Sequence, residues 1–147
     1  MPAAAPLPLV AVINNSEEVV EFLRLALEAS GYRHVTETVL TFKRGQQELQ
    51  QFLATHAPQA VIWDIAFPYA ENWALFCRVR DSGVLAGCGV VLTTANKRAL
   101  EEWVGPTSTL ELVGKPYDVE DILGALARAL TGIGLAPPAD PADQRED

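Results

Sequence analysis

Three polar side chains that could take part in chemistry stand at the ends of apolar runs in this sequence. Asp64 ends the run AVIWD, Thr94 follows the run GVVLT, and Lys115 comes shortly after the run TLELV. A carboxylate can act as a nucleophile or pair with a cation, a hydroxyl can donate a hydrogen bond to an anion, and an ammonium supplies a compact positive charge. Whether these groups meet depends on the elements that carry them.

The elements follow from the spacing of the apolar residues. Short apolar runs bounded by turn residues are typical of strands buried on both faces, and apolar residues three or four apart predict helices. Ser16 and Asp118 are suitable N-caps, and Gly31 suits the end of the first helix. The expected strands are 9–13, 35–42, 60–65, 89–93 and 109–113. The expected helices are 16–31, 46–56, 71–82, 96–104 and 118–132.

This alternation of strands and helices predicts an α/β fold. Right-handed strand–helix–strand units build a parallel sheet with helices on both faces. We expect a five-stranded, doubly wound, flavodoxin-like sheet with the strand order 2-1-3-4-5. The carboxyl ends of its strands share one edge, so Asn14 and Asn15 should lie beside Asp64 in one cleft. Thr94 and Lys115 should lie on the same edge.

Length and charge limit the classes of protein to which the chain can belong. Its 147 residues suit one domain, expected at 9–131, with a flexible N-terminus at 1–8 and a disordered acidic tail at 132–147. The formal net charge of -8 argues against binding to nucleic acid or to an anionic membrane. Because no secretion signal or membrane-spanning run is visible, we expect a cytoplasmic protein.

The cysteines and histidines do not suggest a site. Cys77 and Cys88 do not form a disulfide framework, and together with His34 and His56 they show no zinc-binding spacing. We expect all four to pack in the core or lie on the surface.

The ordered set of motifs DIAFP, VVLTTA and VGKPY resembles the receiver domain of two-component response regulators. The resemblance extends over roughly residues 9–130, and Thr94 precedes Lys115 by 21 residues, close to the spacing in the family. Each motif alone is common, whereas the ordered set is specific. The resemblance implies a signalling module and not an enzyme.

The resemblance also implies a role for each site residue. Asp64 would accept a phosphoryl group from a sensor histidine kinase or a phosphotransfer protein. Lys115 would pair with the acyl phosphate, and Thr94 with the adjacent Ala95 would bind its oxygens, with Ala66 in the same cleft. Phosphoryl transfer depends mainly on positioning and charge neutralisation, which these groups supply. Output would pass to a downstream protein or a second copy through the face formed by residues 95–130.

The sequence departs from the family pattern at the metal site. The family has an acidic pair that holds Mg²⁺, and the matching residues here are Asn14 and Asn15. Amide oxygens bring no charge, so Mg²⁺ should bind weakly, with Asp64 and Asn15 as its weak candidate ligands. The same change removes repulsion from Asp64, which favours an ion pair with Lys115. Leu112 replaces the aromatic residue that often precedes the lysine by three positions.

Three hypotheses follow. The first is a stand-alone receiver phosphorylated at Asp64. The second is an atypical pseudo-receiver that works without phosphorylation as a docking or dimerisation module. The third is a small phosphohydrolase or flavin protein. It is disfavoured because Ala66 stands where a hydrolase would carry a second acid, and because no glycine-rich loop follows the first strand.

Overall fold

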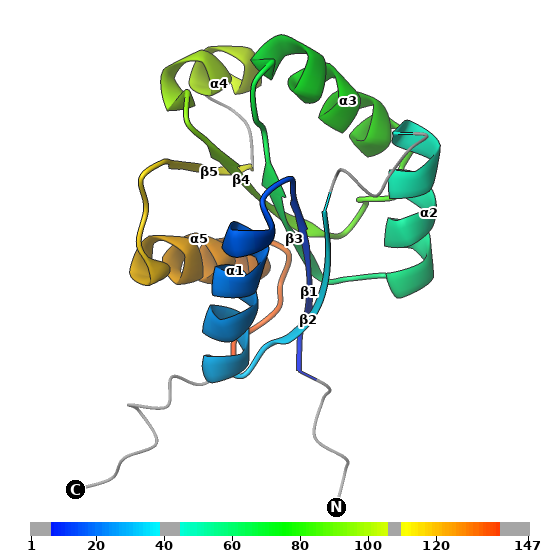
Figure 1. Cartoon of the computed structure of the whole chain (residues 1–147). Coiled ribbons are helices and arrows are strands. Elements are labelled where there is room, and N and C mark those ends of the chain that lie inside the picture. The colour runs from blue at the N-terminus through cyan, green and yellow to red at the C-terminus, as the bar shows by residue number, and fades with distance from the viewer. Residues whose placement is uncertain (1–6, 39–44, 106–109, 139–147) are drawn as a thin grey trace, which may run out of the picture.

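The structure is a computed structural model that describes residues 7–38, 45–105 and 110–138. In these residues strands and helices alternate along the chain (Figure 1). The strands are β1 (Leu9–Asn14), β2 (Arg33–Thr38), β3 (Ala60–Asp64), β4 (Gly89–Thr94) and β5 (Glu111–Gly114). The helices are α1 (Glu17–Ala29), α2 (Gln46–His56), α3 (Tyr69–Asp81), α4 (Lys97–Val104) and α5 (Val119–Gly132).

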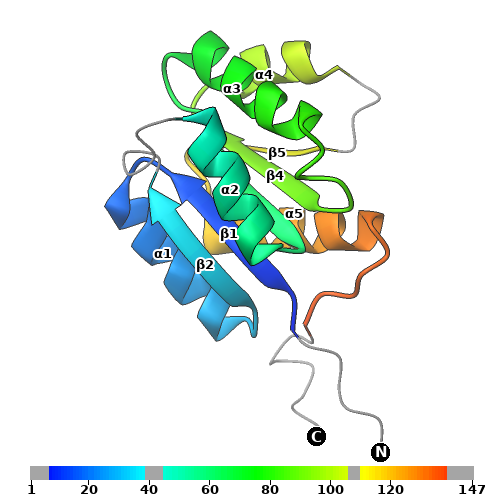
Figure 2. The same cartoon turned by 90° about the vertical axis from the view of Figure 1, so that its right-hand side faces the viewer.

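The strands form one parallel sheet in the order β2-β1-β3-β4-β5, which confirms the predicted topology. Figure 2 shows α1 and α5 on one face of this sheet and α2, α3 and α4 on the other. In the register of the central strands, Ile13 lies opposite Trp63 and Asp64 lies opposite Thr93. The ends of β1, β3 and β4 therefore meet at one edge.

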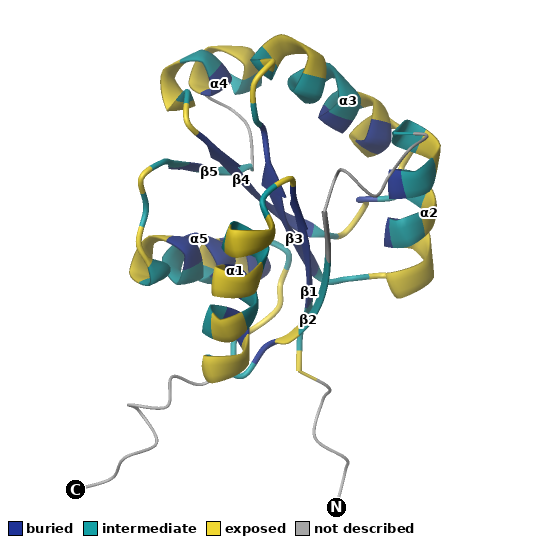
Figure 3. Cartoon of the chain, viewed as in Figure 1, coloured by how far each residue is buried: buried dark blue, intermediate teal, exposed yellow. Residues whose placement is uncertain are grey.

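Two apolar cores lie on the two faces of the sheet, because successive strand residues point to opposite sides. The central strands are buried along their whole length (Figure 3). Val12, Ile62 and Val91 pack with α1 and α5 on one face, whereas Trp63 and Leu92 pack with α2, α3 and α4 on the other. Asp64 and Thr93 follow Ile62 and Val91 by two residues, which places them on the α1–α5 face.

The predicted helix caps are present. The Ser16 hydroxyl accepts a hydrogen bond from the backbone of Val19, and Asp118 forms a capping box with Asp121. Gly31 follows the C-cap of α1 at φ +84°, a conformation that favours glycine. Ser16 and Asp118 fix where the loops at the carboxyl edge turn into α1 and α5, and Gly31 marks the turn from α1 into β2.

Several element boundaries differ from the prediction. β2 begins at Arg33, whose backbone N–H donates to the carbonyl of Pro8, and residues 39–42 of the expected strand lie outside the described residues. Residue 109, the expected start of β5, also lies outside them. α3 begins at Tyr69 because Pro68 acts as its N-cap and accepts a hydrogen bond from the backbone of Asn72.

The end of the domain also differs from the prediction. The boundary expected after residue 131 is too early, since α5 includes Gly132 and Ile133 packs against the α1–α5 core. The backbone N–H of Leu135 then donates to the carbonyl of Leu130, and the chain is described as far as residue 138. The remainder of the expected tail, residues 139–147, lies outside the described part of the chain, as do residues 1–6 of the expected N-terminus.

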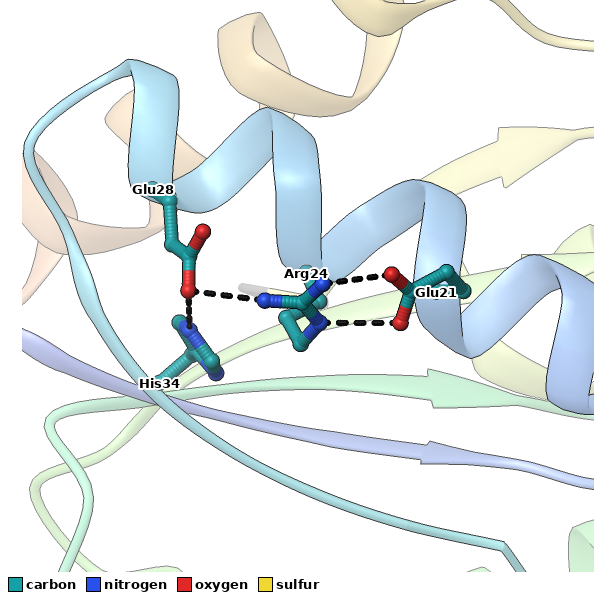
Figure 4. A network of polar contacts seen from close by, with 4 residues as sticks. All are labelled: Glu21, Arg24, Glu28 and His34. Carbon is teal, nitrogen blue, oxygen red and sulfur yellow. Dashed lines mark hydrogen bonds and ion pairs between the residues drawn. The ribbon is translucent and has the colours of Figure 1, made fainter.

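A network of exposed charges links α1 to the edge strand β2 (Figure 4). Arg24 lies between Glu21 and Glu28, and Glu28 also contacts His34 Nε2 at 3.0 Å. The hydrogen bond from His34 lowers the pKa of Glu28, and the hydrogen bond from Arg24 lowers that of Glu21. Because solvent screens exposed pairs, this network contributes little to stability. It shows that His34 is occupied away from the carboxyl edge.

Gly89 offers a test of the packing between β4 and α5. A Cβ atom at this position would lie 2.9 Å from the carbonyl oxygen of Ala129, a backbone atom that cannot move independently of its helix. We predict that Gly89→Ala lowers the free energy of unfolding by about 1–3 kcal/mol, measured by urea denaturation. Gly132→Ala is the control, because Gly132 faces open space; it should leave stability unchanged or raise it slightly. Equal effects of the two changes would contradict the prediction.

Candidate functional site

Asp64 is the last residue of β3 and its carboxylate is buried. The residue is 5% exposed. A carboxylate buried to this extent would carry a large desolvation penalty if it had no partner. Asp64 Oδ1 accepts hydrogen bonds from Lys115 Nζ at 2.8 Å and from Thr93 Oγ1 at 2.7 Å. Asp64 Oδ2 has no hydrogen-bond partner within the described ranges. The two oxygens of this carboxylate thus differ in their hydrogen bonding.

The predicted ion pair between Asp64 and Lys115 is confirmed. The backbone N–H of Lys115 donates to the carbonyl of Thr94, which continues the β4–β5 ladder by one residue and places the lysine at the carboxyl edge. From there its side chain, which is 32% exposed, extends from solvent to the carboxylate. The lysine therefore supplies a charge that reaches a site otherwise closed to solvent.

The hydroxyl that donates to Asp64 belongs to Thr93, the residue before Thr94. Thr94 points to the other face of the sheet, where its hydroxyl donates to the carbonyl of Ile65 at 2.8 Å and accepts from the backbone of Asn96 at 3.1 Å. Ala95 follows on the surface. Thr94 thus joins β4 to the loop after β3, and a role for Thr94 and Ala95 in phosphate binding stays a prediction.

A small hollow of about 30 Å³ adjoins Asp64. It is lined by Asn15, Trp63, Asp64 and Ala66, together with Leu49, Asn72 and Leu75. Asn72 Nδ2 donates to the carbonyl of Ala66 at 2.8 Å across this region. The predicted proximity of Asn15, Ala66 and Asp64 is therefore confirmed, and the space between them is about that of one water molecule.

The residues of this cleft do not fit a tight site for the Mg²⁺ that the receiver pattern implies. Among the described residues that line the hollow, Asp64 is the single carboxylate, and Lys115 already neutralises it. Asn14 Oδ1 accepts from the backbone of Ser16, and the carbonyl of Ala66 accepts from Asn72, so both oxygens are engaged. A hard divalent cation prefers several anionic oxygens, which this donor set lacks.

The cysteines and histidines lie away from this cleft, as the sequence analysis expected. Burial raises the pKa of the Cys88 thiol to about 12 and also raises that of Cys77, so neither thiol is activated. His56 Nδ1 contacts the carbonyl of Phe52, and His34 contacts Glu28. The described residues contain no group of three or more His, Cys, Asp and Glu side chains that could hold a metal ion.

Solved structures with a similar fold include receiver domains. Chemotaxis protein CheY4 of Vibrio cholerae has a TM-score of 0.64 and 19% identity, over 84% of this chain and 99% of that one. The PhyR response regulator receiver domain of Erythrobacter litoralis has a TM-score of 0.67 and 17% identity, over 85% and 91% of the two chains. No family model matches the sequence.

The chain has the fold of a response regulator receiver domain. A receiver-modulated diguanylate cyclase of Pelobacter carbinolicus gives the same result, with a TM-score of 0.65 and 17% identity over 87% of this chain and 96% of that one. The receiver fold thus accounts for most of the chain. No described helix of this fold combines the length and the apolar character needed to cross a membrane.

The sequence analysis missed one residue of the site around Asp64, which is Thr93. The signal for Thr93 was its position opposite Asp64, which only the strand register reveals. The Thr93 hydroxyl donates to Asp64 Oδ1 at 2.7 Å.

Removal of the lysine charge tests the ion pair. We predict that Lys115→Met lowers the free energy of unfolding by about 2–3 kcal/mol, because it leaves a buried carboxylate without its cation. The value should stay below that of a fully buried pair because Lys115 is partly exposed. Adding Asp64→Asn to this variant should restore part of the loss. Guanidinium denaturation of the single and double variants measures both effects.

Lys97→Met is the matched control for this experiment. Lys97 pairs with Glu101 at 3.9 Å, and both side chains are about half exposed. Its loss should change stability by no more than about 0.5 kcal/mol. If Lys115→Met is equally mild, the ion pair does not stabilise the fold.

Proposed function

We propose that this protein is a phosphoacceptor in a phosphorelay and that Asp64 is the residue that is phosphorylated. The observation that carries the proposal is the difference in hydrogen bonding between the two oxygens of Asp64. Lys115 and Thr93 hold Oδ1, whereas Oδ2 is left without a hydrogen bond among the described residues. A carboxylate fixed in this way has one oxygen available as a nucleophile.

The proposed step is transfer of a phosphoryl group to this oxygen. Asp64 Oδ2 attacks phosphorus, an O–P bond forms, and the bond from phosphorus to the donor breaks. The donor is a phosphohistidine of a sensor kinase or phosphotransfer protein, and its imidazole leaves with the bonding electrons and takes a proton from water. Lys115 then lies close to the added phosphoryl oxygens, where its charge compensates theirs.

Access to Asp64 requires a local rearrangement, because the adjoining hollow has room for about one water molecule. The Asn72–Ala66 hydrogen bond crosses the loop after β3, so this loop is the segment that must shift for a phosphoryl group to enter. Phe67 in the same loop is 79% exposed, and an exposed aromatic side chain three residues from the acceptor suits contact with a donor protein.

The proposal includes output through protein contact and a cytoplasmic location, where the kinase domains that would serve as donors reside. The face of residues 95–130 offers a hollow of about 350 Å³ between α4, β5 and α5. Lys97 and Arg128 line it together with Glu120 and Asp121, so it presents both signs of charge. Such a surface suits a polar protein partner or a second copy of the chain. We propose no enzymatic activity of its own.

The direct test is incubation with acetyl phosphate or a candidate kinase, followed by mass spectrometry of the intact protein. We predict a gain of one phosphoryl group that is lost in Asp64→Ala, because no other described carboxylate combines burial with a lysine partner. Asp81→Ala is the control, since Asp81 is an exposed acid paired with Arg80. A wild-type protein that gains no mass with any donor would contradict the proposal and favour the pseudo-receiver alternative.

From the neutral amides of Asn14 and Asn15 we predict that the site binds Mg²⁺ weakly. Millimolar Mg²⁺ should produce no measurable rise in the melting temperature, because a ligand stabilises a protein only in proportion to its occupancy of the folded state. Restoring acids with Asn14→Asp and Asn15→Asp should create a rise of several degrees. Differential scanning fluorimetry with and without Mg²⁺ measures both proteins, and a rise of several degrees in the wild type would contradict our interpretation of the donor set.

A further inference from the structure

The loop that follows β3 is fixed to the sheet at its first residue, Ile65. This residue is fully buried. Its backbone N–H donates to the carbonyl of Thr93 at 2.8 Å, and its own carbonyl accepts from the Thr94 hydroxyl at 2.8 Å. Because Ile65 is bonded to β4 through both its N–H and its carbonyl, the part of the loop that can shift without breaking the sheet begins at Ala66.

The side chain of Asn72 holds this second part of the loop. Asn72 lies near the start of α3, and its Nδ2 donates to the carbonyl of Ala66 at 2.8 Å. The backbone N–H of Asn72 donates separately to the carbonyl of Pro68 at 3.1 Å, as the first turn of a helix requires. The side-chain bond can therefore be removed while the helix keeps its own hydrogen bond.

This side-chain bond lies at the hollow beside the acceptor. Ala66 and Asn72 line the hollow of about 30 Å³ together with Asp64, and a phosphoryl group is larger than the one water molecule that fits there. Leu49 and Trp63 in the same lining are buried in the core between the sheet and α2, α3 and α4, so they cannot yield without disturbing that core. Ala66 is only half-buried. The loop is thus the wall of the hollow that can move.

We propose that Asn72 is the gate residue of the Asp64 site: its side-chain amide holds the carbonyl of Ala66 and keeps the loop closed over the acceptor. The inference rests on the proposed phosphoacceptor role and adds the regulation of access to it. Phe67, the next residue of the loop, is 79% exposed. A protein that binds this ring more tightly in the open loop than in the closed one shifts the loop towards the open state.

Hydrogen–deuterium exchange on the full chain tests whether Asn72 closes the loop. In Asn72→Ala, the backbone amides of residues 65–71 should exchange roughly two- to tenfold faster than in the wild type, the factor expected for the loss of one hydrogen bond. The helix should persist, because alanine favours helices more than asparagine does. Exchange across α5 should stay unchanged. A matching rise across α5 would overturn the proposal, because Asn72 would then stabilise the whole domain and not the loop.

Two further variants isolate the hydrogen bond. Glu71→Ala changes an exposed residue beside Asn72 on α3 and should leave exchange in the loop as in the wild type. Asn72→Leu keeps a side chain of similar size that has no amide to donate, so it should exchange as fast as Asn72→Ala. Wild-type exchange in Asn72→Leu would overturn the proposal, because the side chain would then close the loop by filling space. Equal exchange in Asn72→Ala and Glu71→Ala would overturn it as well.

The rate of phosphoryl gain from acetyl phosphate, followed by the mass of the intact protein, tests the gate itself. Asn72→Ala should gain the group several-fold faster than the wild type, whereas Glu71→Ala should match the wild type. A rate in Asn72→Ala at or below that of the wild type would overturn the gate, even with faster exchange, because the bond would then brace the loop without controlling access. If neither protein gains a phosphoryl group, the proposed function fails, and exchange alone decides whether Asn72 closes the loop.

Discussion

The interaction on which the site depends is the contact between Lys115 and the buried carboxylate of Asp64. A carboxylate at the end of a central strand is shielded from water on both faces of the sheet, so it must have a compensating charge. Lys115 supplies that charge from the next-but-one strand, at 2.8 Å. The strand order therefore does more than build a core, because it brings a cation to an acid 51 positions earlier in the chain.

The neutral amides at the end of β1 give this ion pair its character. With two acids beside it, Asp64 would share Lys115 with an excess of negative charge that calls for a divalent cation. With the neutral residues Asn14 and Asn15 at the end of β1, the negative charge of Asp64 and the positive charge of Lys115 cancel. Asn14 then serves the backbone by accepting from Ser16, at the entry to α1. The structure therefore shows a self-contained pair of Asp64 and Lys115.

The two oxygens of Asp64 connect this electrostatic balance to the proposed chemistry. Oδ1 is held by a charged donor, Lys115, and a neutral donor, Thr93. Oδ2 adjoins no donor in the described residues, which would cost free energy in a purely structural carboxylate. A buried polar atom without a partner therefore calls for an explanation beyond stability. The chain keeps the fold of known receiver domains at sequence identities of 17% and 19%.

The sequence by itself determined the fold class, the strand order and the residues at the carboxyl edge. Buried strands and helix caps leave local signals, such as the apolar run before Asp64 and the capping residues Ser16 and Asp118. Only the tertiary structure decided which hydroxyl meets Asp64. Adjacent threonines point to opposite faces of a sheet, and a shift of one residue in register exchanges them. Contacts between distant elements depend on register and turn geometry, which apolar spacing does not encode.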